Sequence, residues 1–397
     1  MFAGVPSDKK FTDASLCNTN CKKNMRDKVR VLSFNVLTPH FAGADTFVRN
    51  SASDLSSRRR LDNLLTQLSD QMENYPTCVI CLQEVCQNWA NRLIRWFENL
   101  NYHFVYRLYG SAKSGHMGVG IAYARDHLRL LGCNISRVTD SVQSFIERAD
   151  NGTSAGTATT KTSSVSLSSW LFSCAQNAWF GAGYNGKCNR SETTVKRQTD
   201  WLHHVCSKYQ CAIVLEFETR TVNRRKFNVA TCHMPCDWRN SEIMMLHALL
   251  LTRCVQTSVL NSHTPLIFAG DFNTRPGEMA YKALTQPLQD LPKHTEDDRL
   301  DLLFQSVVED LSFDFEPFES AYVQVQKSEP EYTTNCYSTW KNGSGDVFCD
   351  TIDYVLLRNC HATEVLDLYH KRKSHLLPSA HLAEPSDHLM IGATVEV

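Results

Sequence analysis

Residues 268–278 read FAGDFNTRPGE, and the apolar run that leads into them stops at Gly270 and Asp271, two residues before Asn273. A short apolar run of this kind predicts a buried strand. The proline and glycine that follow predict a turn, and a helix is expected near 278–286. This strand therefore ends by presenting a carboxylate and an amide where the backbone turns, and Gly270 allows a close approach of backbone or substrate at that point.

Similar apolar runs predict strands along most of the chain, and helical spacing of apolar residues predicts three long helices. The strands are expected at 29–36, 78–85, 102–109, 119–125, 211–220, 227–234, 264–270, 353–358 and 389–397, and the helices at 61–72, 89–100 and 240–260. Strands and helices are mixed without the strict alternation of a barrel. The pattern therefore predicts an α/β (α+β) fold, in which sheets are layered with helices outside.

We expect a single domain at 29–397, preceded by a polar N-terminal tail at 1–28. An insertion rich in Ser, Thr and Gly is predicted at about 150–196, because its composition cannot bury much surface. The chain has 397 residues, a length that one large α/β unit accommodates.

Composition excludes some classes of partner and favours one redox environment. The formal net charge is −1, so there is no overall basic field to hold duplex DNA. Many of the 16 cysteines, such as Cys78, Cys81 and Cys211, lie inside apolar runs and are interpreted as small buried residues in a reducing compartment. No secretory signal or membrane span is recognised, so no membrane partner is expected. A cytoplasmic location is preferred, with nucleus and mitochondrion left open.

Polar side chains stand at the ends of several of these strands, without an obvious packing reason. Each alone is more often a satisfied polar residue, a solvated edge or a turn. Together they supply carboxylates, amides and histidines to the edge where a layered sandwich gathers its loops. Such a set suits a phosphate ester and a hard divalent cation such as Mg²⁺. The residues are Asn35, Gln83, Glu84, His233, Asp271, Asn273, Asp353, Asp387 and His388.

The motifs SFNVL, LQEV, ATCHM, GDFN, TIDYVLL and PSDHL occur in this order and together resemble the motif series of the endonuclease/exonuclease/phosphatase superfamily. The segment EPEYTT, the STWK that follows it and the final PSDHL look most like the deadenylase group that includes nocturnin and the carbon-catabolite-repressor nucleases. The resemblance covers nearly the whole chain except 1–28 and 150–196. It implies a four-layer sandwich of two stacked mixed β-sheets flanked by helices.

The resemblance also implies a role for each matching residue. Glu84 resembles the main Mg²⁺ ligand, Asn35 sits beside it, and Asp387 is a further ligand of metal or water; Mn²⁺ is the alternative ion. Asp271 resembles the residue that holds and activates the attacking water. Asn273 and His233 are expected to contact the scissile phosphate. His388 is expected to stabilise the phosphoryl oxygens, supported by Asp353, with Asp350 as the less favoured alternative.

Substrate contacts are expected from Asn335, Trp340 and Arg275. Trp340 is interpreted either as a stacking residue for a base or as an apolar lid. The run SSRRR at 56–60 is read as a solvated helix start, with contact to substrate phosphates as the alternative. Cys236, close after the motif histidine, is expected to tune or crowd the site.

Three functions follow as hypotheses. The first is a metal-dependent 3′-5′ exoribonuclease that acts on the 3′ end of single-stranded RNA and releases 5′-mononucleotides. The second is a phosphatase of a small phosphorylated nucleotide, as nocturnin acts on the 2′-phosphate of NADP. The third is a catalytically silent nucleic-acid-binding module, which the completeness of the motif set makes the weakest. Fold analogy does not choose between the first two, and protein partners stay unknown.

Overall fold

The computed structural model describes residues 27–141, 208–291, 307–309, 316–339, 347–368 and 375–397. Most of the tail predicted at 1–28 and the whole insertion predicted at about 150–196 lie outside these residues. Trp340 lies outside them as well.

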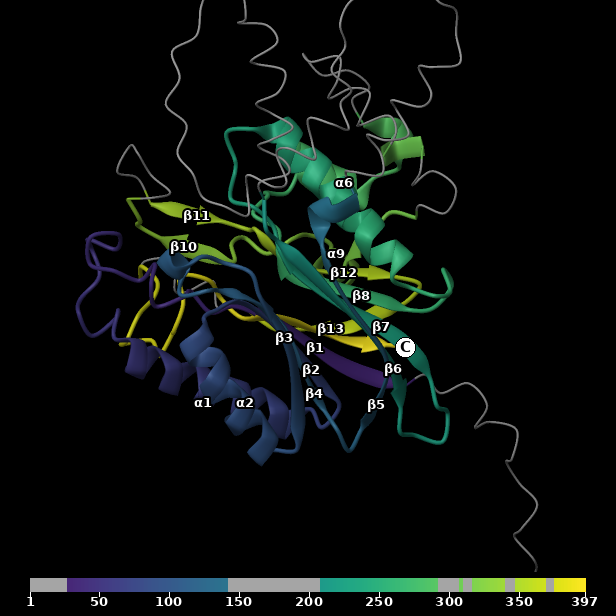
Figure 1. Cartoon of the computed structure of the whole chain (residues 1–397), viewed down its shortest axis with the longest axis horizontal. Coiled ribbons are helices and arrows are strands. Elements are labelled where there is room, and N and C mark those ends of the chain that lie inside the picture. Colours follow the sequence, from purple (N-terminus) through teal and green to yellow (C-terminus); the bar gives the residue numbers. More distant parts are fainter. Residues whose placement is uncertain (1–26, 142–207, 292–306, 310–315, 340–346, 369–374) are drawn as a thin grey trace, which may run out of the picture.

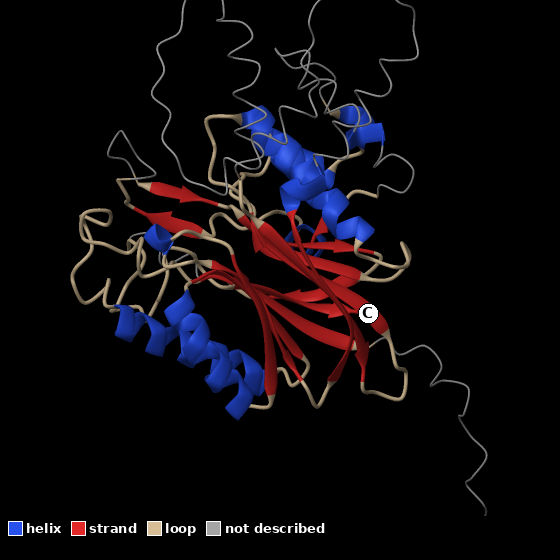
Figure 2. Cartoon of the chain, viewed as in Figure 1, coloured by secondary structure: helices blue, strands red, loops and turns tan. Residues whose placement is uncertain are grey.

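Two six-stranded mixed sheets stack on one another and form the centre of the protein (Figures 1 and 2). The first sheet has the order β13 (His361–Val365), β14 (Ile391–Glu396), β1 (Lys28–Asn35), β2 (Cys78–Val85), β4 (Gly118–Ala124), β3 (Tyr102–Leu108). The second has the order β5 (Leu128–Arg137), β6 (Cys211–Thr219), β7 (Lys226–His233), β8 (Leu266–Asp271), β12 (Asp353–Arg358), β9 (Glu319–Ser320). A separate ribbon pairs β10 (Thr334–Cys336) with β11 (Phe348–Asp350).

Helices cover the outer faces of the two sheets, so the predicted four-layer sandwich is confirmed (Figure 2). The apolar stripes of α1 (Ser57–Asn74) and α2 (Gln87–Asn99) pack on the first sheet. Helices α6 (Ser241–Thr257) and α7 (Met279–Thr285) pack on the second sheet. A short helix, α9 (Ala321–Gln326), adds Ala321 and Tyr322 to the core between the sheets.

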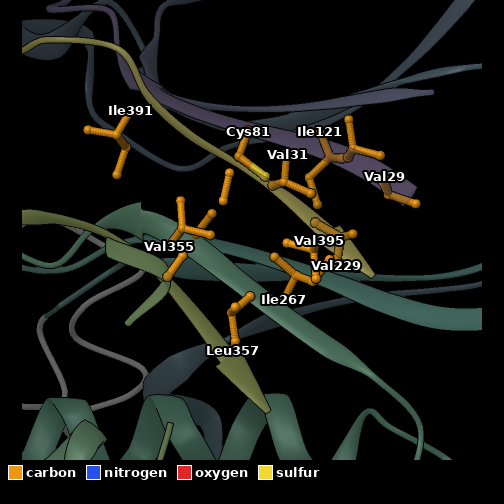
Figure 3. Close-up of a cluster of buried hydrophobic side chains, with 14 of the residues drawn as sticks. Val29, Val31, Cys81, Ile121, Val229, Ile267, Val355, Leu357, Ile391 and Val395 are labelled. Atoms are coloured by element: carbon orange, nitrogen blue, oxygen red, sulfur yellow. The ribbon is translucent and has the colours of Figure 1, made fainter. Parts of the chain in front are cut away.

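The core between the sheets is built from branched aliphatic side chains of both sheets. Figure 3 shows Val31 and Val395 of the first sheet meeting Val229 and Ile267 of the second. These strands are buried on both faces, because helices cover the outside, and their sequences are therefore nearly continuous apolar runs. The nine predicted strands are all present, each with ends within two residues of its predicted bounds; eight of them are almost wholly buried, and β3 is a partly exposed edge strand.

The strands that the sequence did not reveal are edge strands or short ones. β5 lies at the edge of the second sheet, and its residues are mostly half-buried or exposed, so it lacks a long apolar run. β9, β10 and β11 have only two or three residues each. β13 is an edge strand of the first sheet and is largely exposed.

Two further expectations are borne out by packing. Cys78, Cys81 and Cys211 are buried and outside disulfides, and burial raises the pKa of the Cys78 and Cys81 thiols to about 12. A Cβ at Gly270 would come within 2.4 Å of the carbonyl oxygen of Cys232 on β7, so glycine permits the close approach of the two strands there.

Among the described helices, none combines the length and the apolar character that crossing a membrane requires.

Candidate active site

Strand register brings the predicted site residues to one edge of the sandwich. β7 and β8 run parallel with His233 beside Asp271, and antiparallel β12 begins with Asp353 on the other side of Asp271. In the first sheet β1 and β2 run parallel, and they end at Asn35 and Val85, directly after Glu84. Both parallel pairs therefore finish at the same edge.

The segment that leads into β14 supplies the last residues. β14 pairs antiparallel with β1, with Ile391 opposite Ser33, so the residues just before β14 lie beyond the carboxyl end of β1. Ser386 Oγ donates to the backbone oxygen of Asn35 at 2.6 Å, which fixes this segment against the strand. Asp387 and His388 consequently reach the edge at which β1, β2, β7 and β8 end.

Asn35 lies between two buried carboxylates, one from each sheet. Its Nδ2 donates to Glu84 Oε1 at 3.0 Å and to Asp271 Oδ2 at 2.9 Å. Its Oδ1 accepts from the backbone N–H of Leu37 at 3.0 Å, which fixes the orientation of the amide. The other oxygen of Glu84 accepts from the backbone N–H of Thr38 at 3.0 Å. Asn35 thus orients both carboxylates.

The backbone is strained where these side chains enter the site. Leu37, Glu84 and Asn273 have φ values of 51°, 57° and 48°. Residues other than glycine rarely adopt this left-handed backbone conformation, and such backbone strain is concentrated at functional sites. At Glu84 the pairing of β2 with β4 is interrupted between Leu82 and Val85. The carboxylate of Glu84 therefore points into the site because the strand departs from regular pairing there.

His388 and Asp353 form a buried hydrogen-bonded pair. The two are joined by His388 Nδ1 and Asp353 Oδ2 at 2.8 Å, and Thr333 Oγ1 donates to the same carboxylate oxygen at 2.6 Å. His388 Nε2 faces Asp271 Oδ2 at 3.8 Å and Asp387 Oδ1 at 3.9 Å. Burial lowers the pKa of His388, but the charges of the three aspartates outweigh it and raise the pKa to about 9.

Asp271 is the residue on which the other groups converge. Its Oδ1 accepts from the backbone N–H of Asn273 at 2.9 Å, so its Oδ2 is the oxygen that faces the cluster. His233 Nε2 lies 3.5 Å from that Oδ2. The side chain of Asn273 donates to the backbone oxygen of Met234 at 2.9 Å, which ties the ends of β7 and β8 together.

The donor set fits a divalent cation. Glu84 and Asp271, joined through Asn35, place buried carboxylate oxygens close together, with Asp387 beside His388. Buried charges of one sign are costly unless a charge of the other sign is near, and oxygen ligands of this kind are those that hard divalent ions prefer. Ligand atoms of Asp271, Asp353 and His388 also lie within 4.8 Å of one another. In that group Asp353 is committed to His388 and Thr333, so we assign it to the histidine.

Asp353, and not Asp350, is the aspartate that reaches this cluster. Asp350 lies on β11, where its carboxylate forms an ion pair with Arg275, Oδ2 lying 3.1 Å from Nε. Arg275 also stacks its guanidinium on the ring of Phe348, 5.3 Å from the ring centre.

A small hollow of about 120 Å³ opens beside Asn273, and we call it the aromatic hollow. It is lined by Trp238, Phe348, Arg275, Asn273, Cys236, Glu278 and Ile352. Trp238 is 57% exposed, an unusual state for so large an apolar side chain. Arg275 and Cys236 thus line the same hollow, and the predicted contact of Arg275 with substrate stays a prediction.

Asn335 is placed differently. It is buried, and its side-chain nitrogen donates to the backbone oxygen of His375 at 3.0 Å. Its backbone accepts from the N–H of Leu377 at 2.8 Å and donates to the oxygen of Asp387 at 3.3 Å. In this structure Asn335 joins two segments at the site, and its predicted contact with substrate stays a prediction.

Arg60 stabilises the backbone segments that carry two of the site residues. The run at 56–60 leads into α1, as the favoured interpretation of the sequence expected, but the expectation that the run is solvated is wrong for Arg60. Arg60 itself is buried, and its guanidinium donates to the backbone oxygens of Val36, Leu37 and Pro385. It thus joins the ends of the two segments that carry Asn35 and Asp387. Burial lowers the pKa of Arg60 to about 10, against the opposing charges of Asp387 and Glu84.

Sequence reasoning did not single out Tyr109, Trp238 or Phe348. The Tyr109 hydroxyl is buried and has no hydrogen-bond partner among the described residues. Burial raises its pKa well above the ordinary value, and the charges of Glu84 and Asp271 act in the same direction. Tyr109 follows a strand of ordinary pattern, and Trp238 lies in a loop. No motif marks either of them, so only the three-dimensional arrangement reveals their closeness to the site.

Comparison with known proteins shows what the chain is similar to in sequence and in fold. Residues 206–388 match the Endonuclease/Exonuclease/phosphatase family. The CCR4-Not complex 3′-5′-exoribonuclease subunit Ccr4 of Kluyveromyces lactis is 23% identical over 271 residues, covering 65% of this chain and 29% of that protein. This chain therefore spans less than a third of that relative's length.

Two solved structures share the fold over nearly the full length. The human nocturnin catalytic domain with bound sulfate is 17% identical, with a TM-score of 0.53 over 94% of this chain and 95% of that chain. ANGEL2, described as a 2′,3′-cyclic phosphatase in complex with adenosine-2′,3′-vanadate, is 16% identical, with a TM-score of 0.61 over 93% and 96%. At these identities the likeness concerns the fold. Together with the family match, it confirms the resemblance that the sequence motifs predicted.

Proposed function

We propose that this chain, a member of the endonuclease/exonuclease/phosphatase superfamily, is a Mg²⁺-dependent 3′-5′ exoribonuclease that acts on single-stranded RNA and releases 5′-mononucleotides. The observation that carries the proposal is the convergence of Glu84, Asp271 and His388, from both sheets, on one buried polar cluster. The name of the Kluyveromyces lactis relative describes a 3′-5′ exoribonuclease subunit and supports the choice of substrate class.

In this proposal Asp271 holds the attacking water. Its Oδ1 is engaged by the Asn273 N–H, which leaves Oδ2 to accept a hydrogen bond or a proton from water. Asn35 donates to the same Oδ2 and keeps the carboxylate in one orientation. Glu84 and neighbouring oxygens would hold Mg²⁺, and the bound ion would supply positive charge to offset charge developing on the phosphoryl group.

Fixed hydrogen-bond donors do the remaining work. Neighbouring aspartates raise the pKa of His388, which favours its protonated form, with Nε2–H pointing into the cluster while Asp353 holds Nδ1. His233 Nε2 and the second amide hydrogen of Asn273 are the other donors at this edge. Preorganised donors stabilise charge in a transition state, and the loss of one costs about 10²–10³ in rate in other enzymes.

The aromatic hollow supports a nucleotide substrate. Trp238 and Phe348 line it next to Asn273, and Arg275 lies over the Phe348 ring. Stacking of a base on an aromatic side chain is worth about 1–3 kcal/mol and tolerates different bases. A terminal nucleotide with its base in the hollow would have its phosphate near the end of β8.

A second candidate is a phosphatase that removes the 2′-phosphate of NADP or a similar group from another phosphorylated nucleotide. The small size of the aromatic hollow, about 120 Å³, favours one ring at the site and does not by itself require a long strand. A catalytically silent module is the third candidate. It is the least favoured, because it gives no reason for strained, buried carboxylates at the site.

One experiment separates the three. Purified protein is incubated in Mg²⁺, and in parallel in EDTA, with oligo(A), mixed-sequence RNA, NADP and adenosine 2′,3′-cyclic phosphate. Release of AMP from oligo(A), absent in EDTA, is the expected result. Phosphate from NADP, or opening of the cyclic phosphate, with intact RNA would transfer the proposal to a phosphatase. Turnover of none of these substrates across divalent ions would overturn it in favour of a silent module.

A further inference from the structure

A second hollow, of about 580 Å³, lies between the loop that follows β1 and the segment that leads to His388. We call it the basic hollow. Its cationic or potentially cationic side chains are Arg49 and Arg59 on one wall and His375 and His381 on the other. All four are exposed. Arg59 belongs to the SSRRR run, whose alternative role in phosphate binding the catalytic site does not use.

The two walls are fixed to one another by hydrogen bonds. Asn50 Nδ2 donates to the backbone oxygen of Pro378 at 2.8 Å. Asp54 Oδ1 accepts from the N–H of Ala380 at 2.7 Å, and its Oδ2 accepts from both the N–H and the hydroxyl of Ser51 at 2.8 Å. The single carboxylate that lines the hollow is thus engaged in holding the walls together.

The contacts of the Arg49 and Arg59 guanidinium groups decide whether these groups can bind a ligand. Arg49 stacks on the ring of Tyr337, 3.8 Å from the ring centre, which orients its guanidinium and leaves its N–H groups available. Among the described residues neither Arg49 nor Arg59 has a carboxylate oxygen within ion-pair distance, although the charge of Arg59 contributes to lowering the pKa of Asp54. Guanidinium groups match phosphate oxygens in shape and charge and can bind them through two parallel hydrogen bonds.

The hollow is joined to the active site through β10. Thr334 forms a bridge with His388, and the N–H of Leu377, beside His375 and Leu376, donates to Asn335 on the same short strand. The wall of the basic hollow and the segment that carries the catalytic histidine are therefore both hydrogen-bonded to β10, at the backbone of Asn335.

We propose that the basic hollow is a phosphate subsite, in which Arg49 and Arg59 bind a second phosphate of the substrate while the scissile phosphate lies at Asp271 and His388. The inference rests on the proposed function, because it assigns the hollow to the same substrate. The ligand chemistry is a phosphate diester or pyrophosphate. It can come from the backbone of an RNA strand or from the phosphate bridge of a dinucleotide.

Binding without turnover tests the proposal independently of catalysis. Fluorescence anisotropy with labelled oligo(A), in EDTA, compares the intact chain with Arg59→Ala and with the double variant Arg49→Ala/Arg59→Ala. Arg58→Ala is the matched control, because Arg58 is an exposed neighbour on α1 that does not line the hollow. We expect Arg59→Ala to weaken binding by about tenfold, as for removal of a hydrogen bond to a charged group. The slope of log Kd against log salt should fall by about 0.7 for each phosphate that the variant no longer neutralises.

Competition by unlabelled NADP and by the dinucleotide ApA identifies the source of the phosphate. If NADP competes with the intact chain and loses this ability with Arg59→Ala, the subsite takes a pyrophosphate. If longer oligo(A) alone is affected, it takes an RNA backbone; either result supports the proposal. Equal binding of all ligands by Arg59→Ala and Arg58→Ala would overturn it. Absence of RNA hydrolysis by the intact chain would contradict the proposed function. The binding measurements would still show whether Arg59 contributes to phosphate binding, because they do not depend on turnover.

Discussion

Strand β8 carries Ile267 near one end and Asp271 at the other, both buried, and the two positions differ in what surrounds them. Ile267 lies among aliphatic side chains of both sheets (Figure 3). Asp271 lies among Asn35, His233 and His388. The apolar end gains free energy of folding from burial. The polar end buries charge, which opposes folding unless other charges compensate. In β8, therefore, one end contributes to the stability of the fold and the other end contributes to the chemistry of the site.

The comparison predicts its largest effect at the polar end. Asp271→Asn removes the oxygen that holds the attacking water, so we expect the rate of phosphate ester hydrolysis to fall by about 10³ or more, in the range seen when a residue of a catalytic set is removed. Stability should hardly change, because a buried like-charge contact is relieved. Single-turnover hydrolysis and thermal unfolding, measured on the same preparation, check both halves. If Asp271→Asn lowers the stability as well as the rate, the two ends of β8 do not serve stability and chemistry separately.

At the apolar end the expectation is reversed. Ile267→Ala leaves a cavity between the sheets, and such truncations cost about 2–5 kcal/mol of unfolding free energy. Activity per folded molecule should be retained, since Asp271 keeps its register with His233 and Asp353. Urea unfolding followed by circular dichroism gives the stability. A rate assay well below the unfolding transition gives the activity, and a large drop there would show that the two ends are coupled.

The pair of His388 and Asp353 predicts a smaller effect on the rate. Asp353→Asn removes the carboxylate that most raises the pKa of His388, so that pKa should fall and the protonated form should be lost at lower pH. We expect about a 10²-fold loss of rate, as for one preorganised donor. Asp350→Asn is the matched control, because Asp350 bonds to Arg275 instead. An NMR titration of the His388 ring measures the pKa. A larger loss with Asp350→Asn would reverse the assignment of the two aspartates.

The aromatic hollow predicts the smallest effect. Trp238→Ala removes a stacking surface worth about 1–3 kcal/mol, so KM for a nucleotide substrate should rise by about tenfold with little change in kcat. Trp238→Phe keeps an aromatic face and should recover most of the loss. Steady-state kinetics of the three proteins distinguish the cases. If KM is the same for all of them, the base binds elsewhere.

The sequence was sufficient for the parts of the fold that are buried on both faces. Strands such as β2 and β8 are apolar without interruption, so their positions were predicted to within two residues. β5 and β13 were not found, because edge strands are half-exposed and alternate weakly. Local pattern does not report which strands are edges.

The polar residues at strand ends were predictable because a polar side chain directly before or after a buried strand is conspicuous. Glu84, Asp271 and His388 were identified in this way, and the structure brings them together. Tyr109 and Trp238 were not identified, because an aromatic residue in a loop or after a strand is ordinary in sequence. The structural role of Arg60 was not predicted either, since only packing shows that a charged residue at a helix start is buried.

Residues from both sheets are proposed to form one site for a divalent cation, and metal binding tests this proposal without any choice of substrate. Chelator-treated protein is titrated with Mn²⁺, and the free ion is measured by electron paramagnetic resonance for the intact chain and for Glu84→Gln. We expect one ion per intact chain and binding at least about tenfold weaker in the variant, in the range known for perturbed metal sites. Equal affinity and stoichiometry in the two proteins would contradict it.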